Sequence, residues 1–357
     1  MQEIKHECTS WLIFSDLTRN NTNILHKNRD SPKRNIAVLL NAENARYKWV
    51  GLGCADEGRT DGSPTMGINE VGLASVMNSG ELCIDNSVSP QAKRTPDILK
   101  AILDSCGSTD EALDLLGQFV KNNDYFHEEY GSIFFFLDKN TACIAEMSAH
   151  FISPQRYDHG YALRANIWHN PDMAAYADNN ATAFLNSANR EFIVIKALND
   201  AIRKRGNVTV EDCLDISRIS QYEASPFERQ LCYKTTNSTS TLELDREYPE
   251  LLSTAYVLIG PPRHTICVPI PICTQEIHPK MLSQAWCQAA WKRFDELGFG
   301  ADIPQAWLEF EKYAFAEYRE AQGKARTLMK EGRRSDAEAL LQNTANNIWE
   351  GAAGLLF

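Results

Sequence analysis

A cysteine near the start of the chain stands in a pattern that could cleave an amide bond. Cys8 begins a largely apolar run at 8–14 that is typical of a β-strand, and a second strand pattern follows at 24–30 after a polar turn. The second strand ends in two cations, an amide and a carboxylate: Lys27, Asn28, Arg29 and Asp30. A thiol beside such groups can attack a carbonyl carbon and form a covalent acyl intermediate.

The base for this attack can be the α-amino group of the cysteine itself, so no separate histidine is needed. The reference pKa of an α-amino group is about 7.7–8.0, which is close to a physiological working pH. In this sequence the Cys8 nitrogen belongs to the Glu7–Cys8 peptide bond. We therefore expect residues 1–7 to be a lead segment that is removed, with the Cys8 thiol attacking the Glu7 carbonyl carbon.

These residues resemble the opening of the linear-amide hydrolases, a group of N-terminal-nucleophile (Ntn) hydrolases. The group includes choloylglycine hydrolase, penicillin V acylase, acid ceramidase and the acyl-coenzyme A:isopenicillin N acyltransferases. Further stretches resemble the motifs of the group in the same order, at 66–73, 95–120, 131–146 and 186–190. The resemblance covers residues 8–200. It implies an α+β fold of four layers, αββα, in which two antiparallel sheets lie between helices.

The resemblance also implies roles for the residues around the thiol. The Asp30 carboxylate is expected to hold the freed amine of Cys8; the alternative is an ordinary turn aspartate. Bile-salt-hydrolase-like members carry an arginine at the position of Lys27. Lys27 is therefore expected to be the cation that favours the thiolate of Cys8. Arg29 is then expected to be a surface or pocket-rim charge.

Two asparagines and a second arginine complete the expected site. Asn166 ends a predicted strand and is expected to donate its side-chain amide to the oxyanion, where one donor contributes about 10²–10³ in rate. Asn170 competes for this role, and the neighbouring His169 is expected to be structural. Asn78, or the backbone N–H beside it, is the candidate for a second oxyanion donor. Arg190 is expected either to stabilise charge around the nucleophile or to lie on a helix surface.

The order of the predicted elements agrees with this fold class. Strand patterns are predicted up to residue 77, between 133 and 166, and as a late hairpin at 254–269. Helical apolar spacing is found at 95–103, 108–120, 192–203 and from about 281 to the end. A loop is predicted at 56–64. This order is typical of one α+β domain at 8–357 with a helical C-terminal part.

Composition excludes several classes of protein. The formal net charge of −11 argues against a nucleic-acid partner, because phosphate binding needs a basic surface. The sequence contains no run of about 18 apolar residues, so no membrane-spanning helix is predicted. The first residues do not have the pattern of a signal peptide, so the compartment stays open between the cytoplasm and export after loss of an unseen leader. The ten cysteines are scattered without a CxxC pair, and we expect no metal site and no cofactor.

The favoured function is a Cys-nucleophile amidase that hydrolyses an N-acyl compound through an acyl-Cys8 intermediate. Trp11, Trp168 and the Phe-rich strand favour a substrate with an apolar part, and the Lys-Asn-Arg-Asp run also fits a dipeptidase-like activity. Two alternatives stay open: an acyltransferase on the same site, and a binding protein of this fold in which the Glu7–Cys8 bond is never cut. The expected partner is a small-molecule amide, and a homo-oligomer is possible.

Overall fold

The computed structural model describes residues 7–41, 44–55, 62–84, 86, 89, 92–126, 129–178, 181–220 and 230–357. Residues 1–6 of the expected lead segment lie outside the described residues, as do residues 56–61 of the loop expected at 56–64. Among the described helices, none is both long enough and apolar enough to cross a lipid bilayer.

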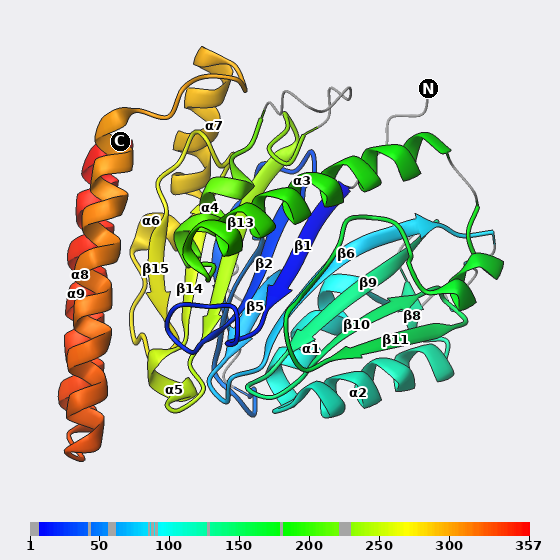
Figure 1. Cartoon of the computed structure of the whole chain (residues 1–357), viewed down its shortest axis with the longest axis horizontal. Helices are drawn as coiled ribbons and strands as arrows, with labels where there is room; N and C mark the ends of the chain where they lie inside the picture. The colour runs from blue at the N-terminus through cyan, green and yellow to red at the C-terminus, as the bar shows by residue number, and fades with distance from the viewer. Residues whose placement is uncertain are drawn as a thin grey trace.

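Two antiparallel sheets form the middle of the molecule, as the sequence predicted (Figure 1). Within the described residues, the first sheet has the strand order β12 (Tyr161–Arg164), β1 (Glu7–Ile13), β2 (Asn23–Asp30), β13 (Thr236–Leu244), β14 (Thr254–Ile259), β15 (Val268–Pro271). The second has the order β11 (Ile152–Tyr157), β10 (Ala142–Met147), β9 (Tyr130–Leu137), β6 (Ala74–Leu82), β5 (Ser63–Asn69), β4 (Trp49–Cys54), β3 (Ile36–Leu40). Two short strands, β7 (Lys93–Arg94) and β8 (Tyr125–Phe126), pair in parallel.

Strand β9 shows how the layers are held together. Its apolar run has side chains on both faces, and successive residues point to opposite sides of a sheet. Phe135 packs into the core that includes both sheets, whereas Phe134 and Phe136 pack into a second core beneath helices α1 (Thr95–Ser105) and α2 (Thr109–Lys121). The expectation that this run is covered on both sides is confirmed, and the second sheet is therefore fixed between two apolar layers.

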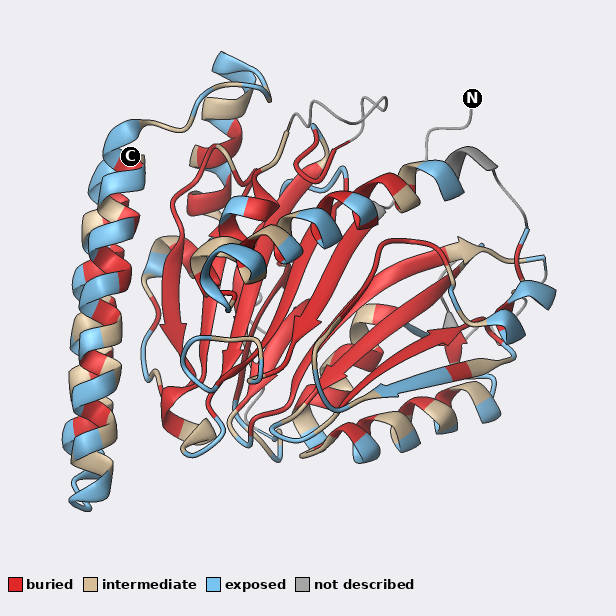
Figure 2. Ribbon diagram, in the orientation of Figure 1, coloured by how far each residue is buried: buried red, intermediate tan, exposed pale blue. Residues whose placement is uncertain are grey.

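Helices α1 and α2 begin where the sequence predicted them. Pro96 lies in the first turn of α1, and the Ser108 side chain caps α2 by accepting a hydrogen bond from the Glu111 N–H. Each helix buries one apolar stripe against the second sheet and turns its polar side to solvent (Figure 2). These two helices form one outer layer of the four.

The other outer layer covers the first sheet. It contains α3 (Ala181–Arg205), α4 (Val210–Ser217), α5 (Pro249–Leu252), α6 (Pro279–Leu282), α7 (Ala285–Leu297), α8 (Gln305–Lys330) and α9 (Arg334–Leu356), and a 3₁₀ helix at Pro171–Ala175 precedes it in the chain. Helix α3 is longer than the predicted 192–203: it begins at Ala181, and Phe184 and Leu185 in its first turns are exposed, so they do not continue the apolar stripe that marks the later turns. The second strand of the late hairpin, predicted at 265–269, lies at Val268–Pro271.

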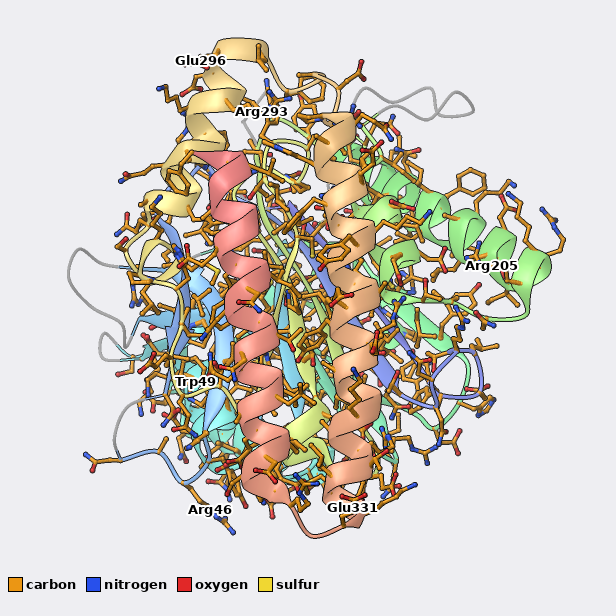
Figure 3. All side chains as sticks on the ribbon, turned by 90° about the vertical axis from the view of Figure 1, so that its left-hand side faces the viewer. Arg46, Trp49, Arg205, Arg293, Glu296 and Glu331 are labelled. Carbon is orange, nitrogen blue, oxygen red and sulfur yellow. The ribbon has the colours of Figure 1, made fainter. Side chains whose placement is uncertain are left out.

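Helices α8 and α9 form a long antiparallel pair against the edge of the first sheet (Figure 3). The chain turns between them at Gly332, which has a φ of 75°, a conformation that favours glycine. Two contacts fix the pair to the sheet layer. Glu311 of α8 makes a buried two-pronged ion pair with Arg218, with N–O distances of 2.7 Å, and Trp349 Nε1 of α9 donates to the Pro269 carbonyl of β15 (2.8 Å).

Candidate active site

Cys8 lies near the start of β1, between the two sheets, with only 6% of its surface exposed. Alternate residues of β1 face opposite ways. Ser10 Oγ donates to Asn78 Oδ1 of the second sheet at 2.8 Å, whereas Trp11 Nε1 points to Cys213 of α4 on the other side. Cys8 shares the face of Ser10, so its thiol belongs to the space between the sheets.

Asn166 and Arg190 both reach the Cys8 backbone. The Cys8 N–H donates to Asn166 Oδ1 at 2.9 Å, and Arg190 Nη1 donates to the Cys8 carbonyl at 2.6 Å. Arg190 Nη2 also donates to Asn166 Oδ1 at 2.9 Å, which links the two side chains. Arg190 is fully buried, so it is not a helix-surface arginine. Segments 158 and 182 residues away along the chain therefore meet at Cys8.

Two hydroxyl groups that the sequence did not single out complete this contact. Arg190 Nη1 donates to Thr9 Oγ1 at 2.8 Å, and Nη2 donates to Ser187 Oγ at 3.1 Å. Ser187 lies one turn before Arg190 on α3, within the stretch that resembled the family motif. The spacing of three residues places both side chains on one helix face, a signal that was readable in the sequence.

The orientation of the Asn166 amide differs from the expected role. Its Oδ1 accepts from two donors, and its Nδ2 donates to the Ser79 carbonyl at 2.7 Å. The two donors require an oxygen at that position, so the amide orientation follows from chemistry. In this structure Asn166 holds the Cys8 nitrogen, the task expected of Asp30, and its N–H₂ group is engaged with the main chain.

Lys27 and Asn78 form a second group of contacts near Cys8, and both are fully buried. Lys27 Nζ donates to the Met77 carbonyl and, at 2.9 Å, to Asn78 Oδ1. Asn78 Nδ2 donates to the carbonyls of Arg164 and Ala165, each at 3.1 Å. Burial lowers the pKa of Lys27, and its interaction with the Cys8 side chain acts in the opposite direction. The Lys27 amine therefore lies close enough to interact with the Cys8 side chain.

Arg29 and Asp30 end strand β2 beside Cys8. In the strand register Arg29 stands opposite Cys8 and Asp30 stands opposite Glu7. The interpretation of Arg29 as a surface charge is wrong: it is 8% exposed, and it donates to Asn237 Oδ1 (3.2 Å) and Cys54 Sγ (3.3 Å). Pairing on both sides of β2 encloses it. Asp30 is 3% exposed rather than in an open turn, and it accepts from Thr236 Oγ1 at 2.5 Å. Burial lowers the pKa of Lys27, and the charge of Asp30 offsets a small part of that lowering.

Acidic residues that the sequence did not single out hold the segment carrying Asn166. Glu146 of β10 accepts from the backbone N–H groups of His169 and Asn170, each at 2.9 Å, and pairs with Arg164 at 2.7 Å. Glu191 accepts from the Ala165 N–H at 2.8 Å and from His169 Nε2 at 2.9 Å. A glutamate in the apolar strand 142–147 was the available signal.

Further contacts involve Asn170, the competing candidate for the oxyanion donor, and His169, which was expected to be structural. The Asn170 side chain donates to the Ser153 carbonyl at 2.9 Å, and its backbone is held by Glu146. His169 is occupied by Glu191. Neither contact involves Cys8. Both residues therefore position the segment that carries Asn166.

The two tryptophans expected near the substrate have different positions. Trp11 is fully buried, stacks on His26 with ring centroids 3.9 Å apart and faces α4, so the expectation that it lines a substrate pocket is wrong. The strand alternation that directs Cys8 inward directs Trp11 outward. Trp168 lies over Gly131 and Gly80, where any side chain would collide with its ring. Trp168 therefore stays a candidate for an apolar wall near Asn166.

The other thiols have a different environment. Within the described residues all ten cysteines are free, and no group of three or more His, Cys, Asp or Glu side chains could hold a metal ion. Burial raises the pKa of the Cys143 and Cys213 thiols to about 12. Such thiols stay protonated and act as small apolar side chains.

The fold has known counterparts. A single-residue variant of conjugated bile acid hydrolase from Clostridium perfringens superposes with a TM-score of 0.52 at 12% identity, covering 75% of this chain and 94% of that one. A second variant of that enzyme gives 0.49 at 13% identity, covering 74% and 92%. Penicillin V acylase from Agrobacterium tumefaciens gives 0.44 at 14% identity, covering 78% and 89%. No family model matches the sequence, and no curated protein matches it.

At such low identity the similarity is one of fold, since one fold can carry several activities. The superposition covers most of both chains, and this chain has the two antiparallel sheets between helices. The resemblance read from the sequence is confirmed at this level: the chain has the αββα sandwich of the Ntn hydrolases, the fold of conjugated bile acid hydrolase.

Proposed function

We propose that this protein is a Cys-nucleophile amidase that cleaves a linear amide through an acyl-Cys8 intermediate. The observation that carries the proposal is the set of contacts around Cys8. Asn166 and Arg190 hold its backbone N–H and carbonyl, and the buried Lys27 ammonium interacts with its side chain. Conjugated bile acid hydrolase, which shares the fold, is a hydrolase by name.

The proposed reaction begins with the free amine of Cys8. The amine takes the thiol proton, and Sγ attacks the substrate carbonyl carbon to form a tetrahedral intermediate. The C–N bond then breaks, and the ammonium of Cys8 returns the proton to the leaving amine. Water next attacks the thioester carbonyl, which releases the acid and restores the thiol. Asn166 Oδ1 already accepts from the Cys8 nitrogen at 2.9 Å, so it supports the ammonium form during this cycle.

The charges around the thiol support this sequence of steps. Lys27 is buried and donates to Asn78 and Met77, so its position is fixed before substrate arrives. A preorganised cation stabilises the thiolate and the developing oxyanion without reorganisation during the reaction. For Asn166 or Asn78 to donate to the oxyanion, its Nδ2 must exchange a main-chain carbonyl for the substrate. The proposal therefore assigns charge stabilisation first to Lys27.

Removal of residues 1–7 is part of the same proposal. The Cys8 thiol attacks the Glu7 carbonyl, the acyl group passes from nitrogen to sulfur, and water resolves the thioester. Fixed geometry can offset about 7–11 kcal/mol of such a barrier when the reacting atoms are aligned. Arg190 and Asn166 bind both sides of the Cys8 backbone, which supports that alignment.

The test follows intact mass and amide hydrolysis in parallel. Wild type, Cys8→Ala and Cys8→Ser are purified under protease inhibition, with Cys83→Ala as the control for loss of another free thiol. Wild type and Cys83→Ala should lose seven residues and hydrolyse N-acyl substrates. Cys8→Ala should do neither, and Cys8→Ser should mature slowly. Full turnover by Cys8→Ala would refute the nucleophile, and equal shortening of all variants would refute self-cleavage.

The same preparation separates the alternatives. Adding amines to the acyl-enzyme distinguishes transfer of the acyl group from hydrolysis. A wild-type protein that keeps Met1 and shows no turnover would instead favour the binding-protein alternative.

A further inference from the structure

A polar cavity lies far from Cys8, between helix α8 and the first sheet. Its volume is about 290 Å³, and it is lined by Asn20, Thr22, Glu243, Asp245, Leu252, Arg319, Gln322, Gly323 and Arg326. Thr22 precedes β2, whereas Lys27 lies five residues further on, about 17 Å away at 3.3 Å per residue. The cavity therefore stands at the opposite end of β2 and β13 from the candidate active site, and binding of a ligand there would not depend on the proposed amidase activity.

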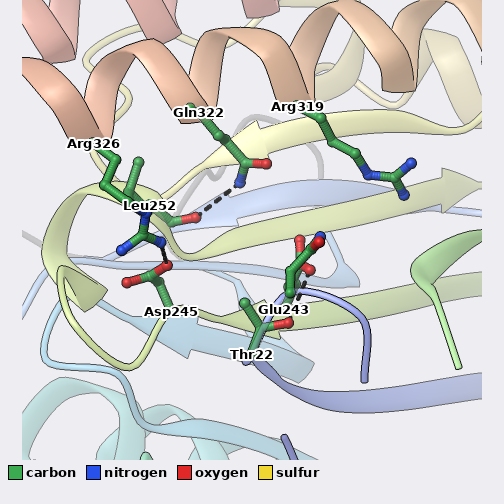
Figure 4. A pocket seen from close by; sticks show the side chains of 9 residues that line it. Thr22, Glu243, Asp245, Leu252, Arg319, Gln322 and Arg326 are labelled. Carbon is green, nitrogen blue, oxygen red and sulfur yellow. Dashed lines mark hydrogen bonds and ion pairs between the residues drawn. The ribbon is translucent and has the colours of Figure 1, made fainter. Parts of the chain in front are cut away.

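Glu243 is the buried charged group of this cavity. It is 5% exposed, and it projects from β13 toward α8 (Figure 4). Thr22 Oγ1 donates to it at 3.0 Å and the Tyr256 hydroxyl at a long 3.4 Å. Within the described residues no Lys, Arg or His nitrogen lies within 4.0 Å of its carboxylate. Burial raises the pKa of Glu243, and the Thr22 hydrogen bond and the more distant charge of Arg319 offset this only in part.

The cations around Glu243 are already paired with other acids. Arg319 pairs with Glu211 of α4. Arg326 pairs with Asp245 and, at 2.5 Å, with Glu247. The cluster thus has four acids for two arginines, and of these acids Glu243 is the one that is not in an ion pair within the described part of the chain. The acids are Glu211, Glu243, Asp245 and Glu247, and the arginines are Arg319 and Arg326. The Gln322 amide donates to the Leu252 carbonyl at 3.1 Å and to Thr254 Oγ1, which directs its own oxygen toward the cavity (Figure 4).

Helix α8 keeps this space open with a glycine. Arg319, Gln322, Gly323 and Arg326 follow the i, i+3, i+4, i+7 spacing of one helix face. A Cβ built at Gly323 would meet no atom within 4 Å. Packing therefore does not require glycine there, although glycine is unfavourable within a helix. Because Gly323 has no side chain, it leaves this wall of the cavity unobstructed.

We propose that this cavity binds a small organic cation, a primary ammonium compound, whose charge lies against Glu243. The ammonium donates to the Glu243 carboxylate and to the Gln322 oxygen, and it supplies the positive charge that the carboxylate lacks. The volume is at the lower end of the range for small-molecule sites, which limits the ligand to a compound of a few heavy atoms. The net negative charge of the chain favours the approach of such a cation.

The test uses 2-aminoethanol as the probe and 1,2-ethanediol as its neutral counterpart. Binding is measured at pH 7 by calorimetry and by the shift in melting temperature, in a Cys8→Ala background that removes the candidate nucleophile. 2-Aminoethanol should bind saturably and raise the melting temperature, whereas the diol at the same concentration should not. Equal effects of both compounds, or no binding of the amine, would overturn the proposal.

Matched variants identify the site. Glu243→Gln should weaken binding by about tenfold or more, because the ion pair is lost while the shape is kept. Gly323→Phe should close the cavity mouth and abolish binding. Glu320→Gln and Gly117→Phe should bind like the parent: Glu320 is an exposed acid of α8 that pairs with Lys324, and Gly117 is an open glycine on α2. If Glu243→Gln does not fold, Gly323→Phe decides, and wild-type affinity in that variant would refute the site.

Discussion

Strands β13 and β9 are both buried along most of their length, yet they bury opposite kinds of side chain. In β13, every residue from Thr236 to Leu244 is buried, and all are polar except Leu242 and Leu244. In β9, the run from Ile133 to Leu137 is entirely apolar and fully buried. The first strand lies beside β2, which carries the candidate site, and the second lies in the middle of the other sheet.

The polar strand is matched to β2 residue by residue. Thr236 donates to Asp30 at 2.5 Å, Thr239 donates to Asn28 at 3.0 Å, and Thr241 lies 2.7 Å from His26 Nδ1. Asn237 accepts from Arg29 at 3.2 Å. A satisfied buried hydrogen bond adds little net stability, but an unsatisfied one is costly. The polar pair therefore fixes positions, and the apolar strand supplies burial energy.

The comparison predicts the largest loss of stability for a truncation in β9. Phe135→Ala should lower the free energy of unfolding by about 3–5 kcal/mol, because a fully buried ring is removed from the core between the sheets. Activity per folded molecule should be retained. Urea denaturation measures the change, with Phe192→Ala, 49% exposed on α3, as the control. If Phe135→Ala lowers the free energy of unfolding no more than Phe192→Ala does, β9 is not the strand that supplies the burial energy.

The next largest effect should appear mainly in activity. Lys27→Met keeps the approximate volume but removes the donor to the Met77 carbonyl and to Asn78 Oδ1, so the free energy of unfolding should fall by about 1–3 kcal/mol. Amide hydrolysis should fall by about 10²–10³-fold, the typical cost of losing one preorganised donor. Lys33→Met, an exposed neighbour in the chain, should change neither quantity. Wild-type kcat in Lys27→Met would remove this lysine from the mechanism.

His26 makes the polar side of the comparison sensitive to pH. Burial lowers its pKa from 6.5 to about 3, so the folded protein favours the neutral ring. The pKa of His26 is lower in the folded than in the unfolded protein. The stability that comes from keeping His26 neutral is therefore fully present above pH 6.5. It is lost as pH falls from 6.5 to 3, by at most about 1.4 kcal/mol per pH unit.

Urea midpoints across that window measure the slope. His26→Gln should flatten it, whereas His159→Gln, on an exposed turn, should leave the slope near that of wild type. An unchanged slope in His26→Gln would assign the acid sensitivity to other groups.

The smallest effect should come from a single polar contact between the two strands. Thr241→Val keeps the shape of the side chain and leaves His26 Nδ1 without its partner, at a cost of about 1–2 kcal/mol in unfolding free energy. Thr327→Val, exposed on α8, should change it by less than about 0.5 kcal/mol. If Thr241→Val lowers the free energy of unfolding as much as Phe135→Ala does, the polar strand β13 contributes to stability as much as β9.

The sequence alone determined the kinds of element and their order. Apolar spacing and capping residues predicted α1 and α2, and the apolar run of β9 predicted a strand covered on both faces. These features are local, because a strand or a helix repeats over a few residues. Cys8, Asn166 and Arg190 could be chosen together only because the chain resembles an Ntn hydrolase.

The tertiary structure decided which way each of these groups faces. Strand alternation states that Cys8 and Trp11 lie on opposite faces, but only the packing of β6 and α4 on the two sides shows which one faces the other sheet. The burial of Arg29 and the direction of the Asn166 amide depend on partners far away in the chain. Hydrogen bonds and charges act over a few ångströms in space, whatever the separation in sequence, so only the folded chain fixes them.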